Sequence, residues 1–136
     1  MINKANVNKD SRIFLVDDDP FWTAMLYKML VDLGYQNICS FSCGTDFLQS
    51  LHLNPDIIFL DYQMEDMDGI EVLVRTKQEN PEINIIFCTG YEDLNIAVHA
   101  IEFGSSEYLL KNNVDLQSLH ATLNGISTGF HKTEVQ

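Results

Sequence analysis

Five short apolar segments alternate with five segments of helical periodicity, and this alternation restricts the fold more than any other feature of the sequence. The apolar segments are residues 12–16, 37–41, 56–61, 83–89 and 106–110, and the helical segments are residues 19–34, 44–53, 70–80, 92–104 and 114–127. Strands that alternate with helices in this way form a parallel sheet with helices on both faces. The first, third and fourth strands are almost continuously apolar, as expected of strands that are buried on both sides. The sequence therefore predicts an α/β, doubly wound domain with five parallel strands.

The first predicted helix has a clear beginning and end. Asp19 is a suitable N-cap, Pro20 fits the first helical position, and Gly34 is a typical stop residue.

Helical spacing predicts that apolar side chains of three helices face the sheet. These residues are Trp22, Met25, Leu26, Met29 and Leu33 in the first helix, Leu94, Ala97, Val98 and Ile101 in the fourth, and Leu116, Leu119, Leu123 and Ile126 in the fifth.

The composition fits one domain and narrows the range of partners. With 136 residues, of which 46% are hydrophobic, the chain is long enough to bury a core. A net charge of −12 would repel nucleic-acid phosphates, so direct nucleic-acid binding is not expected. The sequence has no run of about 18 apolar residues, so membrane insertion is not expected either. We assign residues 12–129 to the domain, residues 1–11 to a flexible lead and residues 130–136 to a tail.

The cysteines and histidines do not form a metal or redox site of their own. Three cysteines in a chain without a secretory signal predict reduced thiols and a cytoplasmic location. Cys39 and Cys43 lack the CxxC spacing of zinc and redox sites, and Cys88 lies far from both. The histidines have no metal-ligand spacing and are expected at exposed helix positions; they are His52, His99, His120 and His131.

Polar side chains follow four of the five predicted strands. The carboxyl ends of parallel strands meet at one edge of a doubly wound sheet, where ligands bind. The residues at this edge are Asp17, Asp18 and Asp19 after the first strand, Asp61 at the end of the third, Thr89 at the end of the fourth and Lys111 after the fifth. A cluster of carboxylates with a hydroxyl and an amine is therefore expected there, with Asp19 serving as the helix cap.

Such a cluster suits divalent-metal binding and phosphoryl transfer. Two carboxylates about 5 Å apart repel by roughly 3 kcal/mol at an effective dielectric constant of about 20. Lys111 would offset part of this repulsion, and Mg²⁺, which prefers oxygen ligands, would offset more. Lys111 and Thr89 would hold phosphoryl oxygens, and Asp61 could act as the nucleophile and form an acyl phosphate. No residue is placed by sequence as a hydrolytic base, which favours a stored phosphoryl group over rapid turnover.

Four sequence blocks, in chain order, resemble the response-regulator receiver domain of two-component signalling. They are FLVDDDP (14–20), DIIFLDYQMEDMDGIEVL (56–73), IIFCTGYED (85–93) and SEYLLKNN (106–113). The resemblance covers about residues 12–129 and implies a flavodoxin-like (βα)5 fold with strand order 2-1-3-4-5. It implies a phosphoacceptor signalling domain rather than an enzyme, with its own phosphorylation and dephosphorylation as the only reactions that it would catalyse.

The resemblance also implies a phosphoacceptor and its metal ligands. Asp61 would accept a phosphoryl group from a histidine kinase or a phosphotransfer protein. Mg²⁺, or Mn²⁺ in its place, would be bound by Asp18, Asp61 and the backbone carbonyl of Gln63, with Asp17 contributing through water.

Further roles implied by the resemblance concern the phosphoryl group. Thr89 and Lys111 would hold it, and Tyr108 matches the aromatic switch position of the fifth strand. Gln63 and Tyr91 would flank the path of an attacking water and set the lifetime of the phosphoryl group.

The chain departs from the family pattern at two positions. Glu65 stands where the family often has proline, which loosens a loop but removes no ligand. Asn112 follows Lys111, where the family usually has proline, often after a cis bond. Because a non-proline cis peptide costs about 3–4 kcal/mol, the Lys111–Asn112 peptide is predicted to be trans.

Three other kinds of site fit less well. A calcium-binding loop at residues 61–69 would need acids at Met64 and Arg75. An aspartyl-phosphate phosphatase with a D-x-D motif would need a second acid at Gln63, and the chain has no cap insertion for a substrate pocket. The phosphatase-like enzyme and a degenerate receiver that binds a partner without phosphorylation remain the alternatives, which a phosphorylation assay would separate.

The output of the domain is expected to be contact with another protein. The tail is too short for a DNA-binding or catalytic domain, so the chain is either a single-domain regulator or a fragment. Some receivers dimerise through paired acids and bases on the fourth helix, fifth strand and fifth helix, but from residue 92 to residue 129 this chain has only Lys111 as a Lys or Arg. A monomer or weak dimer is therefore expected. The acids expected on this surface are Glu92, Asp93, Glu102, Glu107 and Asp115.

Overall fold

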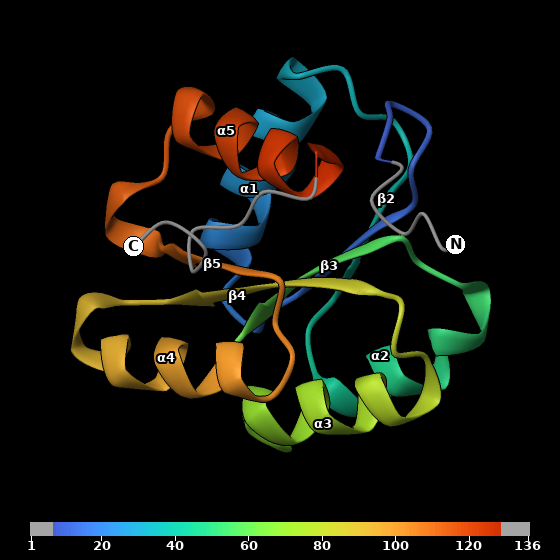
Figure 1. The fold of residues 1–136 in the computed structure, drawn as a ribbon, viewed down its shortest axis with the longest axis vertical. Helices are drawn as coiled ribbons and strands as arrows, with labels where there is room; N and C mark the ends of the chain where they lie inside the picture. Colours follow the sequence, from blue (N-terminus) through green and yellow to red (C-terminus); the bar gives the residue numbers. More distant parts are fainter. Residues whose placement is uncertain (1–6, 129–136) are drawn as a thin grey trace.

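The computed structural model describes residues 7–128, except for the side chains of Tyr91, Ser127 and Thr128. The described residues form one parallel sheet in the predicted order β2-β1-β3-β4-β5 (Figure 1). The strands are β1 (Ile13–Val16), β2 (Ile38–Phe41), β3 (Ile57–Asp61), β4 (Asn84–Thr89) and β5 (Glu107–Leu110). The α-helices are α1 (Pro20–Asp32), α2 (Gly44–Gln49), α3 (Gly69–Glu79), α4 (Leu94–Glu102) and α5 (Leu116–Thr128), and the short 3₁₀ helices are η1 (Leu51–Leu53), η2 (Tyr91–Asp93) and η3 (Lys111–Asn113).

The sheet lies between two layers of helices. α1 and α5 cover one face, and α2, α3 and α4 cover the other (Figure 1). Because helices cover both faces, β1, β3 and β4 are buried along their whole lengths. Alternate side chains of β1 enter two separate cores: Leu15 shares one buried cluster with Leu119, and Phe14 shares the other with Phe47. None of the helices within residues 7–128 has the length and apolar character needed to cross a membrane.

α1 begins and ends where the sequence predicts, but its buried face differs in part. The Asp19 side chain caps the helix, and Gly34 has a φ of 101°, a left-handed conformation that favours glycine. The fully buried residues are Trp22, Leu26 and Leu30, which repeat every four positions. Met25, which was predicted to face the sheet, is 37% exposed. Neighbouring residues are about 100° apart around a helix, so Met25 lies off the stripe that contacts the sheet.

The buried face of α4 also differs from the prediction. Its buried residues are Ala97 and Ala100, whereas Leu94 and Val98 are exposed. Two alanines allow the helix to lie close to the sheet, so the larger side chains point outward. In α5, Leu119, Leu123 and Ile126 are buried as predicted, but Leu116 in the first turn is exposed.

Two local predictions are corrected and one is confirmed. The predicted helix over 44–53 is divided at Ser50: α2 ends at Gln49, and the rest is the 3₁₀ helix η1, which ends before left-handed Asn54. Glu107, expected on the acidic surface, is buried with Leu109 on one face of β5. Lys111–Asn112 is trans, because the described residues contain no cis peptide.

Residues 7–11, which were assigned to the flexible lead, contact the domain. Val7 packs against the core on the α1 side, and Ser11 is buried. Lys9 donates a hydrogen bond to the Leu33 carbonyl at 2.8 Å and lies over the Tyr35 ring. The rest of the predicted lead (1–6) and the tail (130–136), with His131, lie outside the described residues.

Candidate functional site

Three carboxylates converge at the carboxyl ends of β1 and β3. Asp17 directly follows β1, Asp61 is the last residue of β3, and these two strands pair in parallel. Oxygen atoms of Asp17, Asp18 and Asp61 all lie within 4.8 Å of one another. Asp17 and Asp61 are only 6% and 7% exposed, whereas Asp18 is exposed. The structure therefore brings together the three acids that the strand-end argument placed at this edge.

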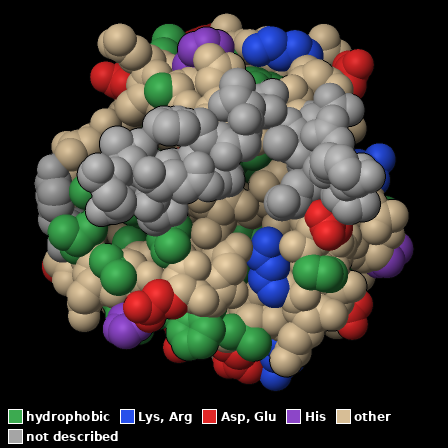
Figure 2. Space-filling model, in the orientation of Figure 1, with side chains coloured by type: hydrophobic (Ala, Val, Ile, Leu, Met, Phe, Trp, Pro, Cys, Tyr) green, Lys and Arg blue, Asp and Glu red, His purple; other side chains and the backbone are tan. Residues whose placement is uncertain are grey.

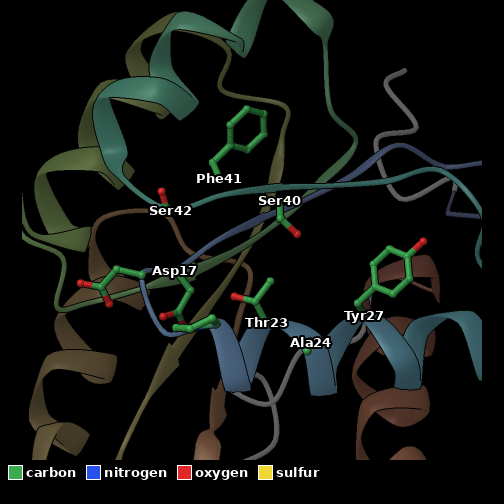
Figure 3. Close-up of a pocket in the computed structure, with 9 residues that line it drawn as sticks. Asp17, Thr23, Ala24, Tyr27, Ser40, Phe41 and Ser42 are labelled. Carbon is green, nitrogen blue, oxygen red and sulfur yellow. The ribbon is translucent and has the colours of Figure 1, made fainter.

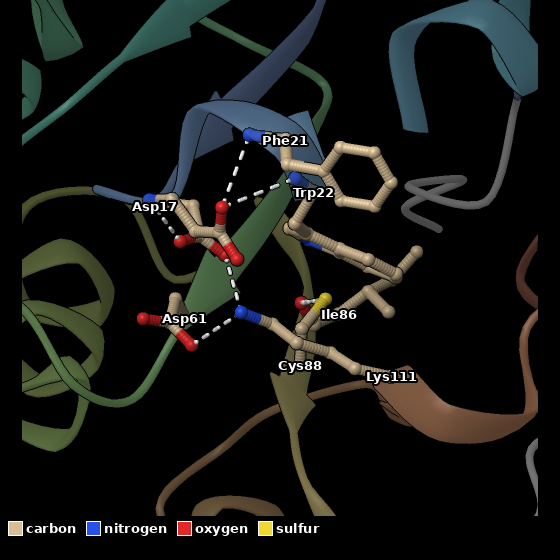
Figure 4. Close-up of polar contacts among 8 residues, drawn as sticks. Asp17, Phe21, Trp22, Asp61, Ile86, Cys88 and Lys111 are labelled. Atoms are coloured by element: carbon tan, nitrogen blue, oxygen red, sulfur yellow. Dashed lines mark hydrogen bonds and ion pairs between the residues drawn. The ribbon is translucent and has the colours of Figure 1, made fainter. Parts of the chain in front are cut away.

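Lys111 supplies the cation of this cluster from the far edge of the sheet. It follows β5, which is separated from β3 by β4. Its Nζ lies 2.7 Å from Asp17 Oδ2 and 3.0 Å from Asp61 Oδ1, so one ammonium group bridges two buried carboxylates (Figure 4). Asp17 also accepts a hydrogen bond from the Asp19 backbone N–H at 2.9 Å. Asp19 itself caps α1, as predicted, and is thus engaged elsewhere.

Three acids share the single ammonium, and the pKa values of two of them, Asp17 and Asp61, are raised. Burial raises the pKa of Asp61 to about 6, repulsion from Asp17 adds to this, and Lys111 opposes it. Burial also raises the pKa of Asp17, although hydrogen bonds from Lys111 and the Asp19 backbone lower it. Burial acts to lower the pKa of Lys111, but its bonds to Asp17 and Asp61 outweigh this effect and raise the pKa. Burial and mutual repulsion thus make the ionised acids costly in the absence of a further cation.

A hard divalent cation fits this arrangement. The donor set consists of carboxylate oxygens, and exposed Asp18 keeps one side open to water, as Mg²⁺ requires. The acids line a cavity of about 320 Å³, which Gln63 also lines. The predicted contribution of the Gln63 backbone carbonyl to metal binding stays a prediction.

Thr89 places a hydroxyl in the same cavity. It is the last residue of β4 and is 1% exposed. Within residues 7–128, its buried Oγ1 has no hydrogen-bond partner. A buried hydroxyl without a partner costs free energy. Because Thr89 lines the cavity together with Asp61 and Lys111, an acceptor bound there, such as a phosphoryl oxygen, would give this hydroxyl a partner.

Two aromatic residues, Tyr108 and Tyr91, are predicted to act with the site. Tyr108 is half-buried in β5, opposite Phe87 of β4, and packs against the core on the α4 side. It is not among the described residues that line the cavity. The side chain of Tyr91 lies outside the described residues. The switch role of Tyr108 and the lifetime role of Tyr91 therefore stay predictions.

Sequence patterns did not predict the anchor of the loop after Asp61. The Asp66 carboxylate accepts hydrogen bonds from the backbone N–H groups of Gly44 at 3.1 Å and Thr45 at 2.7 Å, and from the Thr45 hydroxyl at 2.6 Å. It thereby caps α2, whose own N-cap residue, Cys43, makes no side-chain hydrogen bond to the helix. These hydrogen bonds, that of the Thr45 hydroxyl first, hold the pKa of Asp66 below its usual range. Asp66 lies 22 positions after Gly44 and 21 after Thr45, and no local sequence pattern relates an acid to a helix end at such a separation.

The same loop returns closely to the end of β3. The Gly69 N–H donates a hydrogen bond to the Tyr62 carbonyl at 2.7 Å. A Cβ atom at Gly69 would overlap the Asp61 carbonyl oxygen, so only glycine fits this approach. Asp68 then caps α3 through the Glu71 N–H at 2.9 Å. These contacts position the backbone on which Asp61 lies.

A second, larger cavity of about 600 Å³ adjoins the acidic cluster. It shares Asp17 and Asp18 with the first cavity and extends between α1 and the end of β2. Figure 3 shows Thr23 and Tyr27 on α1 on one side of it and Ser40 on β2 on the other. No basic residue is among the described residues that line it. The smaller cavity, which Lys111 lines, is therefore the better fit for an anionic phosphoryl group.

Comparisons with known proteins find related sequences and a related fold. The sequence model of the response regulator receiver domain matches residues 13–124. The chain is 29% identical over 117 residues to the chemotaxis protein CheY of Bacillus subtilis (strain 168), covering 83% of this chain and 98% of CheY. It is 36% identical over 98 residues to the luminescence regulatory protein LuxO of Vibrio campbellii, covering 71% of this chain but only 21% of LuxO. The chain thus spans about a fifth of the length of LuxO.

A solved structure shares the fold. The crystal structure of a response regulator receiver domain protein from Clostridium thermocellum superposes with a TM-score of 0.79 at 26% identity. The superposition covers 93% of this chain and 99% of that one.

Proposed function

Because the chain belongs to the response regulator receiver domain family of two-component signalling, we propose that Asp61 is its phosphoacceptor. The observation that carries this proposal is the position of the Asp61 carboxylate: it ends a central strand, 3.0 Å from the Lys111 ammonium and beside Asp17 and Asp18. The Lys111 ammonium would neutralise charge on the incoming phosphoryl group, and Asp17 and Asp18 would help to hold a divalent cation that does the same.

The proposed step transfers a phosphoryl group from a phosphohistidine to Asp61. An Asp61 carboxylate oxygen attacks phosphorus, and the new O–P bond forms as the N–P bond to the donor imidazole breaks. The bonding electrons go to the imidazole nitrogen. Lys111 and the buried Thr89 hydroxyl would donate hydrogen bonds to phosphoryl oxygens. Mg²⁺ or Mn²⁺, held by Asp18, Asp61 and the Gln63 backbone carbonyl and through water by Asp17, would neutralise phosphoryl charge when bound.

A receiver domain is a signalling domain, and we propose that this one turns over no external substrate. Its only reactions would be its own phosphorylation and the hydrolysis of its acyl phosphate. In this proposal the donor is a histidine kinase or a phosphotransfer protein in the cytoplasm, and the phosphorylated form binds a downstream protein. Leu94, Val98 and Phe103 are exposed on α4 and at its end, and we propose the α4 side as the surface for that protein (Figure 2).

Chemical phosphorylation tests the proposal. Acetyl phosphate or phosphoramidate with Mg²⁺ should add one phosphoryl group, measured as intact mass and removable by hydroxylamine, a reagent that cleaves acyl phosphates. Asp61→Asn should not acquire the group. Asp46→Asn, an exposed acid in the first turn of α2, is the matched control and should be labelled like the wild type. Equal labelling of Asp61→Asn would overturn the assignment and favour another acceptor, and an unlabelled wild type would favour a phosphorylation-independent binding module.

A further inference from the structure

Trp22 contacts the cation of the site, although no sequence motif assigns it a role there. The Lys111 Nζ lies 5.3 Å from the centre of the Trp22 ring (Figure 4). This distance is within the range of cation–π attraction, for which tryptophan is the best of the aromatic side chains. Trp22 is 4% exposed, so little water screens the contact. The ammonium group is therefore bounded by two carboxylates and one indole face.

The ring and the Asp17 carboxylate are positioned by the same short segment. Asp17 accepts a hydrogen bond from the Asp19 N–H at 2.9 Å. The Asp19 side chain in turn accepts hydrogen bonds from the N–H groups of Phe21 at 3.0 Å and Trp22 at 3.4 Å. Beyond this segment, Trp22 belongs to the same buried cluster as Leu26. One capped turn thus positions both an anionic and an aromatic partner for Lys111, which comes from the opposite end of the chain.

A neutral ring can restrict the ammonium group without forming another ion pair. An ammonium has three N–H donors, and Asp17 and Asp61 lie within reach of two. A carboxylate in place of the ring would accept a hydrogen bond from the remaining N–H of the ammonium and would add negative charge to an already acidic cluster. The ring instead limits where the nitrogen can lie, and a donor remains for a phosphoryl oxygen. Such positioning before the reaction is the most effective form of electrostatic stabilisation.

We propose that Trp22 is a positioning residue for phosphoryl transfer: its indole face holds the Lys111 ammonium beside Asp61. This inference rests on the proposed function for its kinetic consequence, but the contact itself can be tested without phosphorylation. Trp22 is the only tryptophan of the chain, so its emission reports on its own surroundings.

The first experiment measures tryptophan emission in the metal-free, unphosphorylated protein. Lys111→Met should change the intensity or wavelength of the emission, because it removes a charge next to the ring. The matched control is Lys28→Met on the same helix, whose ammonium pairs with Asp32 at the exposed surface, and it should leave the emission unchanged. Equal emission of the wild type and Lys111→Met would overturn the contact. This readout is independent of whether Asp61 is the phosphoacceptor.

The second experiment measures the rate constant of phosphorylation by phosphoramidate at saturating Mg²⁺. Trp22→Leu should slow it about tenfold, the size expected from losing a shielded cation–π contact. Trp22→Phe, which keeps an aromatic face, should recover most of the rate. Both variants are compared only after their thermal unfolding shows a folded domain; if Trp22→Leu does not fold, Trp22→Phe and Trp22→Tyr take its place, with a smaller loss expected.

A double-mutant comparison separates positioning from packing. If Trp22 acts through Lys111, the substitution at Trp22 should have little further effect on the rate in a Lys111→Met background. An equal slowing in the presence and absence of Lys111 would show a packing role and overturn the proposal, as would an unchanged rate in Trp22→Leu. If the wild type is not phosphorylated at all, the proposed function fails. The emission experiment still shows whether Lys111 contacts Trp22.

Discussion

The ammonium nitrogen of Lys111 lies 2.7 Å from Oδ2 of Asp17, a carboxylate 94 positions earlier in the chain. The contact joins the two ends of the domain across the sheet. It also partly neutralises a buried acid whose pKa is raised by burial. The charge balance of the site therefore depends on a pair that exists only in the folded chain.

Removal of Lys111 should destabilise the metal-free protein. Lys111→Met leaves Asp17 and Asp61 without their cation, and breaking a largely buried pair costs about 2–3 kcal/mol or more of unfolding free energy. Urea unfolding with EDTA present measures this loss. The control Lys28→Met disrupts an exposed pair on one helix and should cost less than about 1 kcal/mol. Equal losses for the two variants would contradict the assigned charge balance.

The Asp61 carboxylate should make metal-free stability fall as pH rises. Its pKa is about 6 in the folded protein, above the ordinary value of 3.8, so the folded state binds the proton more tightly than the unfolded state. Ionisation of Asp61 thus opposes folding, and this cost develops between about pH 4 and pH 6. Asp61→Asn should therefore gain stability over the wild type across this window, by about 3 kcal/mol at pH 7.

Unfolding free energies of both proteins at a series of pH values, with EDTA present, measure the effect. Asp46→Asn serves as the control and should differ from the wild type by a small, nearly constant amount. If Asp61→Asn is the less stable protein at pH 7, Asp61 is not a strained carboxylate.

Mg²⁺ should raise the melting temperature of the wild type, and EDTA should reverse the change. A ligand that binds only the folded state adds about 2.7 kcal/mol of stability at 100 times its Kd. Asp18→Asn should lose most of this response and keep its fold, because Asp18 is exposed. Asp46→Asn should respond like the wild type. A full Mg²⁺ response in Asp18→Asn would exclude Asp18 as a ligand.

Asp66 should contribute to stability through α2 rather than through the acidic cluster. Asp66→Ala removes the hydrogen bonds to Gly44 and Thr45, and the loss of an N-cap interaction costs about 1–2 kcal/mol. Because hydrogen bonding lowers its pKa, this contribution is present above about pH 4 and is lost as pH falls further. Chemical unfolding at pH 7 measures the effect. Glu82→Ala, at an exposed loop acid, should be nearly neutral.

Activation should not produce a charge-paired dimer through α4, β5 and α5. The exposed acids there are Glu92, Glu102 and Asp115, and Lys111, the only Lys or Arg between residues 92 and 129, is bound within the site. Like charges would meet across a two-fold axis and repel. Sedimentation with and without beryllofluoride, a phosphoryl mimic, should give the monomer mass in both cases. A dimer that forms only with the mimic, and that is lost on mutation of this surface, would refute the prediction.

Two regularities of the sequence determined the fold and the position of the site. Short apolar runs alternate with segments of helical periodicity, and this alternation predicts a parallel sheet with helices on both faces. A short apolar run fits a strand that is buried on both sides, whereas apolar residues at helical spacing fit one face of a helix. Parallel strands end at the same edge, so Asp17, Asp61 and Thr89 could be placed together from their positions alone. The order of the strands came from the resemblance of sequence blocks rather than from periodicity.

Only the tertiary structure decided how side chains from distant segments meet. Periodicity placed Val98 inside, but close packing of α4 through Ala97 and Ala100 turns it outward. The strand-end argument placed Lys111 near the acids, but which carboxylates it bridges and its contact with Trp22 have no sequence signal. These contacts depend on distances between elements, which the packing of the whole core determines, whereas the sequence pattern records only which side chains each element must bury.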